Sequence, residues 1–199
     1  MRRRMIGGQV VSNGIYILHT NGKLYTYDKW NRSWRDDAVG VALISDNCSF
    51  VISITEMYSQ CWTYKSGLIA GVTTASSSVE AKKDFNGFQN TQSIVEYIDS
   101  NGSCAACNCT FYQFKNGSRG YLASVGEWME IISNLDEINK CMSLINGLDI
   151  DEGTTSYWTS TQYNYEKAWL VTYNGNEFYP NNEGKTNPSY AIRPISQLI

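Results

Sequence analysis

The first half of the chain places apolar and polar residues at the two-residue period of β-strands. The stretch "GIYILHTNGKLYTYDKW" contains two apolar and aromatic runs joined by Asn21-Gly22. This dipeptide between two such runs is typical of a tight β-hairpin turn. "VGVALIS" and "FVISIT" are two further β-rich runs, separated by Asp46-Asn47. The pattern therefore predicts at least four strands before residue 60.

The segments around these strands set the expected division of the chain. Residues 1–12 show no apolar period, and we expect a flexible or partner-bound N-terminal arm there. Residues 13–83 form the β-rich N-terminal part, and the Ser/Thr/Gly-rich stretch 65–90 is expected to be loop. Residues 84–199 form the second part, which we expect to build one compact unit with residues 13–83.

The clearest helical period lies in "SVGEWMEIISNLDEINKCMSLIN", residues 124–146. Ser124 and Glu127 fit the S-x-x-E capping box, and Asn146-Gly147 provides a stop signal. Between these ends, apolar residues recur at helical spacing: Val125, Trp128, Ile132, Leu135, Ile138, Met142 and Ile145. Shorter helical turns are predicted in "NTQSIVEYI" and "CAACNCTFYQF".

Short strand patterns return after the long helix, in "YWTST", "AWLVTY", "EFYP" and "YAIRPI". Strands, then helices, then strands again is an order typical of the α+β class. We expect the helix at 124–146 to pack on a sheet that contains "YAIRPI" and one N-terminal strand. Trp158 and Trp169 are expected in the core, and Arg193 is expected to pair with a carboxylate.

Composition excludes some partners. The 199 residues are 42% hydrophobic, which is enough for a sizeable core. The net charge of −3 leaves no basic footprint, so we expect no nucleic-acid partner. No stretch reaches 18 apolar residues, so we expect no membrane insertion. The N-terminal Arg cluster is not followed by the apolar core of a secretory signal.

Six cysteines raise the question of a metal site: Cys48, Cys61, Cys104, Cys107, Cys109 and Cys141. The cluster "CAACNC" invites a zinc or iron–sulfur interpretation, but zinc would need a fourth ligand from a second pair. The only histidine, His19, lies in an apolar run and is interpreted as a strand residue. We therefore expect reduced, mostly buried thiols, no metal and no cofactor.

Four pieces of the second half occur in a recognisable order: "DFNGFQNTQSI", "GYLASVGEWMEI", "YWTSTQYNYEKAW" and "YAIRPI". Over about residues 84–195 they resemble the C-type-lectin-fold proteins of bacteria and phages. These include the variable proteins of diversity-generating retroelements, such as phage tropism determinants. The usual forms are close to G-[YW]-L-P-S-x-x-E-[WL] and Y-W-S-S-T, from which Ala123 and Thr159 depart. The resemblance implies a C-type lectin-like fold of short antiparallel strands and two helices, here with an N-terminal β-rich extension.

The resemblance also implies where a ligand would bind. In these proteins the segment from Y-W-S-S-T to the terminal R-P strand forms the ligand-facing end, and retroelement action enriches it in Asn and Tyr. Residues 156–194 contain six Asn and six Tyr, a mix that paratopes also use. Turn chemistry is the alternative, and it explains Asn174-Gly175 and Asn181-Asn182 better than Tyr163-Asn164-Tyr165. The predicted ligand-binding residues on one exposed face are Gln162, Tyr163, Asn164, Tyr165, Lys167, Tyr173, Asn176, Tyr179, Asn181 and Asn182.

The resulting functional hypothesis is a non-enzymatic ligand-binding or display protein. We expect a phage virion protein, from a tail or head fibre, that is assembled in the host cytoplasm and binds a bacterial surface receptor or glycan. Its other partners would be virion proteins and copies of itself, with a trimer favoured, and the bacterial cell surface is the alternative location. The alternative function is a structural virion component without receptor binding, in which residues 1–83 dock to neighbours.

Two further hypotheses of function start from the same fold class. Calcium-dependent sugar binding needs E-P-N or Q-P-D followed by W-N-D, and neither "YPNNEG" nor "TNPS" matches. An enzyme of the formylglycine-generating type needs a reactive cysteine pair in the C-terminal half of the fold. None of the six cysteines lies beyond Cys141, so the expectation is that the chain is not an enzyme.

Overall fold

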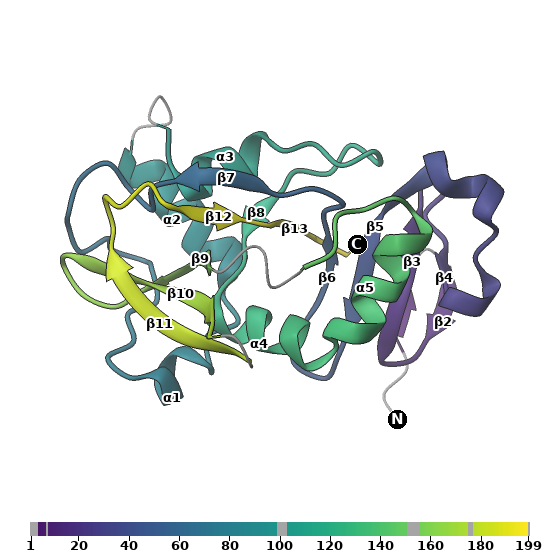
Figure 1. Cartoon of the computed structure of the whole chain (residues 1–199), viewed down its shortest axis with the longest axis horizontal. Coiled ribbons are helices and arrows are strands. Elements are labelled where there is room, and N and C mark those ends of the chain that lie inside the picture. The colour runs from purple at the N-terminus through teal and green to yellow at the C-terminus, as the bar shows by residue number, and fades with distance from the viewer. Residues whose placement is uncertain (1–3, 7, 99–102, 151–155, 175–176, 199) are drawn as a thin grey trace.

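A computed structural model describes residues 4–6, 8–98, 103–150, 156–174 and 177–198. The two larger sheets lie side by side along the long axis of the molecule, with helices packed around them (Figure 1). The six-stranded sheet has the order β4 (Leu24–Tyr25), β3 (Gly14–His19), β5 (Ala38–Ile44), β6 (Ser49–Ile52), β13 (Pro194–Gln197), β8 (Tyr121–Leu122). The five-stranded sheet has the order β11 (Phe178–Gly184), β10 (Lys167–Tyr173), β9 (Ser156–Gln162), β12 (Tyr190–Ile192), β7 (Met57–Gln60). The α+β class is confirmed.

The N-terminal strands follow the predicted pattern. β3 and β4 pair antiparallel across the Asn21-Gly22 turn, where Gly22 has a φ of +81°. β5 pairs with both β3 and β6, and every residue of β5 is buried. Two short 3-10 helices, η1 (Tyr27–Lys29) and η2 (Arg32–Asp37), connect β4 to β5.

The expected N-terminal arm has regular structure over its described residues. β1 (Arg4–Ile6) and β2 (Gln9–Val11) form an antiparallel hairpin. Ile6 and Val11 are buried against the six-stranded sheet. Each of these strands has only three residues, which is too few for the two-residue period of a strand to be recognised in the sequence.

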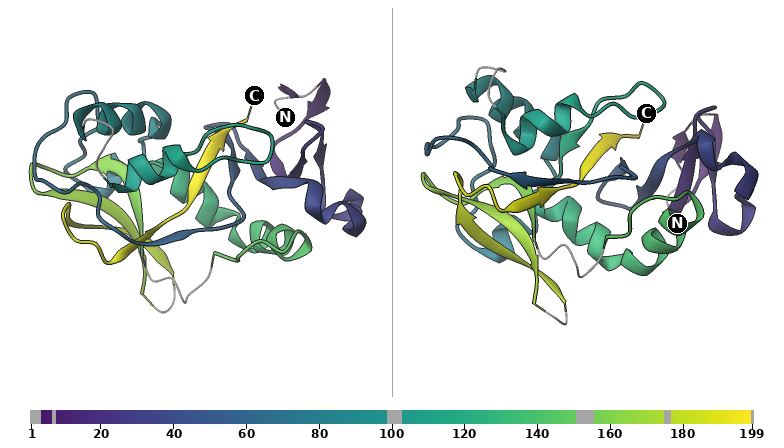
Figure 2. Two further views of the ribbon diagram at one scale, coloured as in Figure 1. Left: turned by 90° about the horizontal axis from the view of Figure 1, so that it is seen from above. Right: turned by 45° about the horizontal axis from the view of Figure 1, so that its top comes forward.

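The two halves of the chain share the six-stranded sheet. β13, from the end of the chain, pairs antiparallel with β6 from the N-terminal half. "YAIRPI" is divided between the sheets, because β12 joins the five-stranded sheet while β13 joins the six-stranded one. Figure 2 shows this last stretch running from one sheet into the other. The prediction that it pairs with an N-terminal strand is confirmed.

The long predicted helix is two helices, α4 (Val125–Ser133) and α5 (Leu135–Leu144), with Asn134 between them. Asn134 leaves the helical region, and its side chain donates to the Glu130 carbonyl at 2.8 Å. An Asn side chain that bonds to nearby backbone competes with helix formation, which explains the break. α5 packs on β3 and β5. At its end Asn146, with φ 55°, adopts the left-handed conformation of a helix stop.

Three further helices complete the fold: α1 (Ser78–Ala81), α2 (Gly87–Ile98) and α3 (Ala105–Phe111). Part of the stretch 65–90 is therefore helical, contrary to the loop expectation, because Ser77 caps α1 through the Glu80 amide. Trp158 and Trp169 are buried, 0% and 4% exposed, as predicted. In the described part of the chain, no helix combines the length and apolar character needed to cross a bilayer.

Candidate functional site

The polar residues of "DFNGFQNTQSI" and "YWTST" form a buried network. The Asp84 carboxylate accepts hydrogen bonds from Thr161 Oγ1 (2.7 Å) and Asn90 Nδ2 (2.9 Å). It also accepts from Thr73 Oγ1 and from the Asn86 amide, each at 3.0 Å. A buried carboxylate with this many donors is satisfied. Asp84 is therefore a structural anchor that holds α2 and the segment before it against β9.

Glu127 caps α4 from a buried position, as predicted. Its carboxylate accepts from the Ser124 amide (2.8 Å) and from the Tyr121 hydroxyl (3.0 Å). Burial raises the pKa of this carboxyl to about 7, even though the hydrogen bonds from Ser124 and Tyr121 oppose the shift. Gly87 packs so closely that a Cβ there would collide with the carboxylate. These contacts make Glu127 part of the scaffold.

Most of the cysteines are buried, and His19 lies at the end of a strand. Four of the six cysteines are buried: Cys104, Cys107, Cys109 and Cys141. Within the described ranges, no three His, Cys, Asp or Glu side chains are placed to hold a metal ion. His19 ends β3, and its Nε2 atom lies 3.9 Å from an Asp37 carboxylate oxygen.

Gln162 is a correction to the predicted ligand face, because it is only 1% exposed. Its Nε2 donates to the carbonyls of Ile69 (2.9 Å) and Val72 (3.2 Å). Its Oε1 accepts from the Ile69 amide and from Lys185 Nζ, both at 3.2 Å. The segment that follows Trp62 in the chain covers this end of β9, and nothing in the sequence indicated that it would. Gln162 cannot contact a ligand from this position.

The turn after Gln162 uses its asparagine for its own shape. Asn164 Oδ1 accepts from the backbone amides of Glu166 (2.9 Å) and Lys167 (2.8 Å). Tyr163 is half-buried and packs edge-on against Trp169, with ring centres 5.4 Å apart. The Asn164 side chain therefore stabilises the turn, which is the alternative to its predicted role in ligand binding. Tyr165, 58% exposed, is the residue of this turn that projects a large side chain into solvent.

The other predicted residues do not gather beside Tyr165. Lys167 begins β10 and Tyr173 ends it, and at about 3.3 Å per residue the two lie roughly 20 Å apart. Tyr173 packs against Phe178 at that far end, with ring centres 5.0 Å apart. Tyr179 is 37% exposed and pairs with β10 one residue before Tyr173. These two tyrosines thus lie at the opposite end of the hairpin from Tyr165.

The predicted asparagines on β11 are also dispersed. Asn181 pairs opposite Leu170 and Asn182 opposite Trp169, near the middle of the hairpin. Successive residues of a strand point to opposite faces, so these two side chains cannot share one surface. Asn176 lies outside the described residues. The structure therefore does not bring the ten predicted residues together into one continuous ligand face.

A different exposed surface surrounds Tyr165. The Gly67 amide donates to the Tyr165 carbonyl at 2.8 Å, which brings the segment 64–68 beside the turn. In that segment Tyr64 is 50% exposed and Leu68 is 59% exposed. Tyr97 of α2 lies directly over Gly67, where a Cβ would collide with its hydroxyl.

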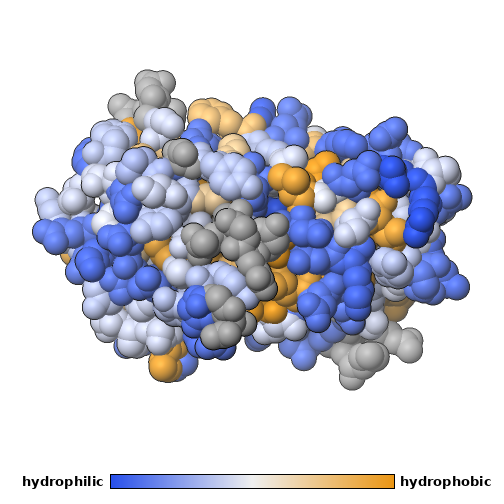
Figure 3. Space-filling view, in the orientation of Figure 1, coloured by the Kyte–Doolittle hydropathy of each residue, from blue (hydrophilic) through white to orange (hydrophobic). Residues whose placement is uncertain are grey.

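Lys65 completes this surface. Its Nζ lies 4.6 Å from the centre of the Tyr97 ring and 5.7 Å from that of Tyr64. We refer to Tyr64, Lys65, Leu68, Tyr97 and Tyr165 as the tyrosine patch. It lies at the end of the molecule that carries the β9–β10 turn, on the left of Figure 1. In the space-filling view this end is mostly blue to white, whereas orange residues gather between the two halves, next to α4 and α5 (Figure 3).

Lys185 is a buried residue that bonds to both segments around the tyrosine patch. Its backbone amide donates to the Glu166 carbonyl (2.9 Å), and its carbonyl accepts from the Thr63 amide (3.0 Å). Its buried Nζ donates to the Gly67 carbonyl and lies 4.7 Å from the centre of the Trp62 ring. Burial lowers the pKa of this amine to about 8. The two segments of the patch that come from opposite halves of the chain are thus joined through one residue, by its backbone and its side chain.

Sequence reasoning missed the patch because its residues lie on three separate segments. Lys65 and Leu68 lie at the start of the Ser/Thr/Gly-rich stretch that was expected to be loop, and Tyr64 directly precedes it. The adjacent Tyr64-Lys65 pair was the only local signal. Contact between this pair, α2 and Tyr165 depends on long-range packing, which no local pattern encodes.

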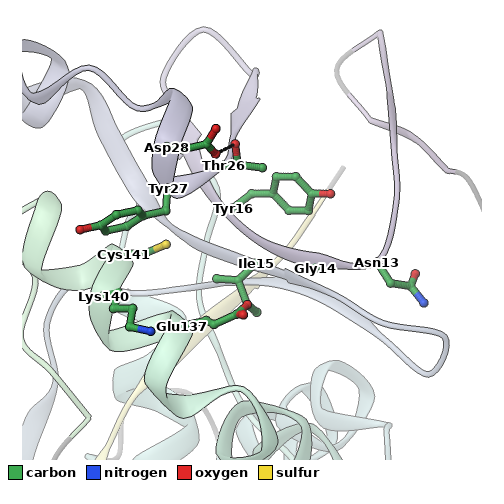
Figure 4. Close-up of a pocket in the computed structure, with 10 residues that line it drawn as sticks. All are labelled: Asn13, Gly14, Ile15, Tyr16, Thr26, Tyr27, Asp28, Glu137, Lys140 and Cys141. Carbon is green, nitrogen blue, oxygen red and sulfur yellow. Dashed lines mark hydrogen bonds between the residues drawn. The ribbon is translucent and has the colours of Figure 1, made fainter.

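A cavity of about 400 Å³ opens at the other end of the molecule, between β3, η1 and α5 (Figure 4). Tyr27, Asp28, Glu137, Lys140 and Cys141 are among its lining residues. The Asp28 carboxylate already accepts from the Thr26 hydroxyl at 2.6 Å. Burial raises the pKa of the Cys141 thiol to about 11, so it stays protonated near neutral pH. This cavity therefore offers mixed charges without an activated nucleophile.

Comparison with known proteins identifies a fold relative but no family. No family model matches the chain, and no curated protein matches it. Among solved structures, a fimbrial protein from Bacteroides ovatus ATCC 8483 is similar, with a TM-score of 0.62 and 15% sequence identity. The similarity covers 93% of this chain and 48% of the fimbrial protein, so the chain spans about half the length of that relative. At this identity the likeness concerns the fold alone.

Proposed function

We propose that this chain is a non-enzymatic binding module that recognises a bacterial surface receptor or glycan through the tyrosine patch. The observation that carries the proposal is a solvent-exposed group of aromatic rings held on a buried polar scaffold. Tyr165 is 58% exposed and Tyr64 is 50% exposed, while Gln162 and Lys185, whose side chains bond to the segment 67–72 beside them, are buried. Rigid aromatic side chains give large contact area at a small entropic cost.

The chemistry of the patch favours a polar, weakly charged ligand. Three tyrosines present both an apolar ring face and a hydroxyl, and Leu68 adds exposed apolar area. Lys65 is its one charged side chain, and the Tyr97 and Tyr64 rings partly enclose that charge. A surface of this kind suits sugar rings or a polar protein surface better than a highly charged polymer.

Two carriers of the module are compatible with this activity. The motifs in "DFNGFQNTQSI" and "YWTSTQYNYEKAW" support a C-type lectin-like fold in a phage virion protein that attaches to a bacterial host and assembles as a trimer. The similarity of fold to a fimbrial protein supports a bacterial surface appendage instead. We propose the virion receptor-binding role first and the bacterial cell surface as the alternative location.

The test is binding to bacterial surface polysaccharides and to intact bacteria. A panel of immobilised capsular and lipopolysaccharide O-antigen chains would be probed with the purified chain. The double variant Tyr64→Ala/Tyr165→Ala should weaken binding by at least about tenfold, because aromatic anchors carry much of an interface's energy. Its free energy of unfolding should change little, since both side chains are largely exposed.

Two control variants sharpen the test. Tyr27→Ala removes a tyrosine that is 49% exposed at the other end of the molecule, and it should bind as the wild type does. Tyr179→Ala probes the far end of the β10–β11 hairpin. If Tyr179→Ala weakens binding and the double variant does not, the ligand site lies on β11 and the patch proposal is wrong.

A structural role is the second candidate, and the similarity to a fimbrial protein favours it. A structural component would assemble through fixed contacts and would not need the tyrosine patch to be accessible. Light scattering distinguishes the two roles. A stable oligomer whose formation is abolished by Tyr64→Ala/Tyr165→Ala, with no binding to any surface polysaccharide, would favour the structural role.

A further inference from the structure

Three of the cysteines meet where α3 begins. Cys104 is the residue that caps the helix, and its Sγ accepts a hydrogen bond from the Cys107 amide at 3.0 Å. The sequence Cys104-Ala-Ala-Cys107 is thus a C-x-x-C pair in which the Cys104 sulfur already lies against the backbone amide of Cys107.

The geometry of the pair allows a disulfide without loss of the helix. Helical residues three apart have Cβ atoms about 5–6 Å apart, and a disulfide needs about 3.5–4.5 Å. Cys104 has an extended backbone, with φ −149° and ψ 162°, so it stands outside the helical turns. A small rotation of its own backbone can close the remaining gap while Cys107 stays in α3.

The two thiols differ in acidity in the way that exchange chemistry requires. The pKa of Cys107 is lowered, first because the Cys104 thiol donates to its sulfur and further because backbone amides also donate to it. The pKa of Cys104 is raised, because its proton is held in that hydrogen bond and the thiol is buried. The thiolate is the attacking species, so Cys107 is the nucleophile of the pair. Full burial raises the pKa of Cys109 well above its usual value.

Cys61 gives the buried pair a route to solvent. Cys104 and Cys107 are 0% and 1% exposed, whereas Cys61 is only partly buried. The Ala105 amide donates to the Cys61 carbonyl at 2.8 Å, which fixes Cys61 beside the start of α3. The Cys61 thiol donates to the Ser103 carbonyl at 3.7 Å, which places it next to the Cys104 end of the pair. Burial raises the pKa of Cys61, so its thiolate is a minor species near neutral pH and the entry step is slow.

We propose that Cys104 and Cys107 form a reversible dithiol–disulfide site that exchanges with low-molecular-weight disulfides, with Cys61 as the thiol through which exchange enters. Cys61 thiolate attacks one sulfur of R–S–S–R, forming Cys61–S–S–R and releasing the first RS⁻. Cys107 thiolate then attacks the Cys61 sulfur, forming a Cys61–Cys107 disulfide and releasing the second RS⁻. Cys104 gives its proton to a released thiolate, attacks the Cys107 sulfur and frees Cys61.

Electrons and protons balance over the three exchange steps. Two protein thiols lose two electrons and two protons, and one R–S–S–R takes them up to become two R–SH. Cys61 is released in the same reduced form in which it entered the reaction. The proposal does not depend on the ligand-binding role of the tyrosine patch.

The experiment equilibrates the folded full chain with mixtures of reduced and oxidised glutathione, followed by acid quenching, alkylation and peptide mapping. We expect a Cys104–Cys107 disulfide as the main product, reversed by excess reduced glutathione. Cys61→Ser should still form it, but about tenfold more slowly, because the entry thiol is missing. Cys48→Ser, which changes a partly exposed cysteine outside the cluster, should leave both rate and product unchanged.

Serine variants of the pair separate chemistry from folding. Cys104→Ser keeps an oxygen that can accept from the Cys107 amide, so α3 should remain capped. This variant should stop at Cys61–Cys107 or at a mixed disulfide with glutathione. If the wild-type protein itself ends at either of these products, or is not oxidised at all while folded, the proposal is wrong.

Discussion

Two buried cations near the C-terminal end of the chain are held in opposite ways. Arg193 lies between β12 and β13, and its Nη1 atom pairs with a Glu56 carboxylate oxygen at 3.3 Å. Both side chains are almost fully buried, 0% and 3% exposed. The guanidinium also donates to the carbonyls of Ser53 (3.0 Å) and Leu148. The predicted carboxylate partner of Arg193 is thus confirmed.

Lys185 has no such partner. Among the described residues, no carboxylate oxygen lies within 4.0 Å of its Nζ atom. Its charge is met by the carbonyl of Gly67, the amide oxygen of Gln162 and the face of Trp62. Burial lowers the pKa of this amine to about 8, and no nearby carboxylate opposes that shift.

The difference shows where the molecule tolerates an uncompensated charge. Arg193 lies at the junction of the two sheets, where strands from both halves of the chain pair, and its guanidinium bonds across this junction. Lys185 lies under the tyrosine patch, where it connects two loops rather than two sheets. A complete ion pair supports the scaffold, and a partly compensated cation supports the surface that we propose to bind ligand.

The largest effect should follow from breaking the complete pair. Arg193→Met leaves the Glu56 carboxylate buried without its cation, and removing one partner of a buried pair costs about 3–5 kcal/mol. Urea unfolding should show this loss relative to the wild type. Arg32→Met, at an exposed arginine of η2, is the matched control and should change the free energy of unfolding by about 0.5 kcal/mol or less. A loss at Arg193 no larger than the control would contradict the assignment of the pair.

A buried carboxyl without a cation should give the next largest effect. Burial raises the folded-state pKa of Glu127 to about 7 from 4.5. Between these values the folded state binds more protons than the unfolded state, so the stability that Glu127 contributes is lost as pH rises from about 4.5 to 7. The full change is about 3 kcal/mol at 1.36 kcal/mol per pKa unit. Glu127→Gln should remove this slope, measured as unfolding free energy at several pH values.

The smallest effect is expected at Lys185. Lys185→Met removes the poorly compensated charge but leaves the Gly67 carbonyl without its donor, which costs about 1–3 kcal/mol before the gain from removing the charge is subtracted. The net loss at pH 7 should therefore be clearly smaller than that of Arg193→Met. An equal or larger loss would show that the two cations are held equally well.

The pH dependence of Lys185 has the opposite sign to that of Glu127. Its folded-state pKa, about 8, lies below the ordinary 10.5. Between these values the unfolded state binds more protons, so the stability of the wild type rises with pH from about 8 to 10.5. The difference in unfolding free energy between the wild type and Lys185→Met should grow in this window. If this difference in unfolding free energy stays constant with pH, the pKa of the Lys185 amine is not lowered by burial.

Local patterns predicted the fold class and many of its strands and helices. The hairpin at Asn21-Gly22, the strands of residues 38–52 and the capping box of Ser124 all depend on neighbours close in sequence. The break at Asn134 was missed, because the apolar period continues through it while a single side chain ends the helix. The hairpin at residues 4–11 was missed because each of its strands has only three residues.

Long-range packing limited the prediction of the site. Composition drew attention to the segment around Tyr165, and that residue is exposed. Gln162 was assigned to the surface because it follows a strand and is polar, but a distant loop covers it. Asn164 was interpreted as a recognition residue, although its side chain shapes the turn.

The sequence by itself determined the class of the fold, the two tryptophan anchors Trp158 and Trp169, and the helix cap at Glu127. Each of these depends on periodicity or on contacts within a few residues. Only the tertiary structure decided which tyrosines share a surface. β10 separates Tyr165 from Tyr173 by its own length, while one backbone hydrogen bond from Gly67 brings Tyr165 together with residues about a hundred positions earlier. The physical reason is that surface proximity depends on how the elements pack, and a sequence pattern reports only the period of each element.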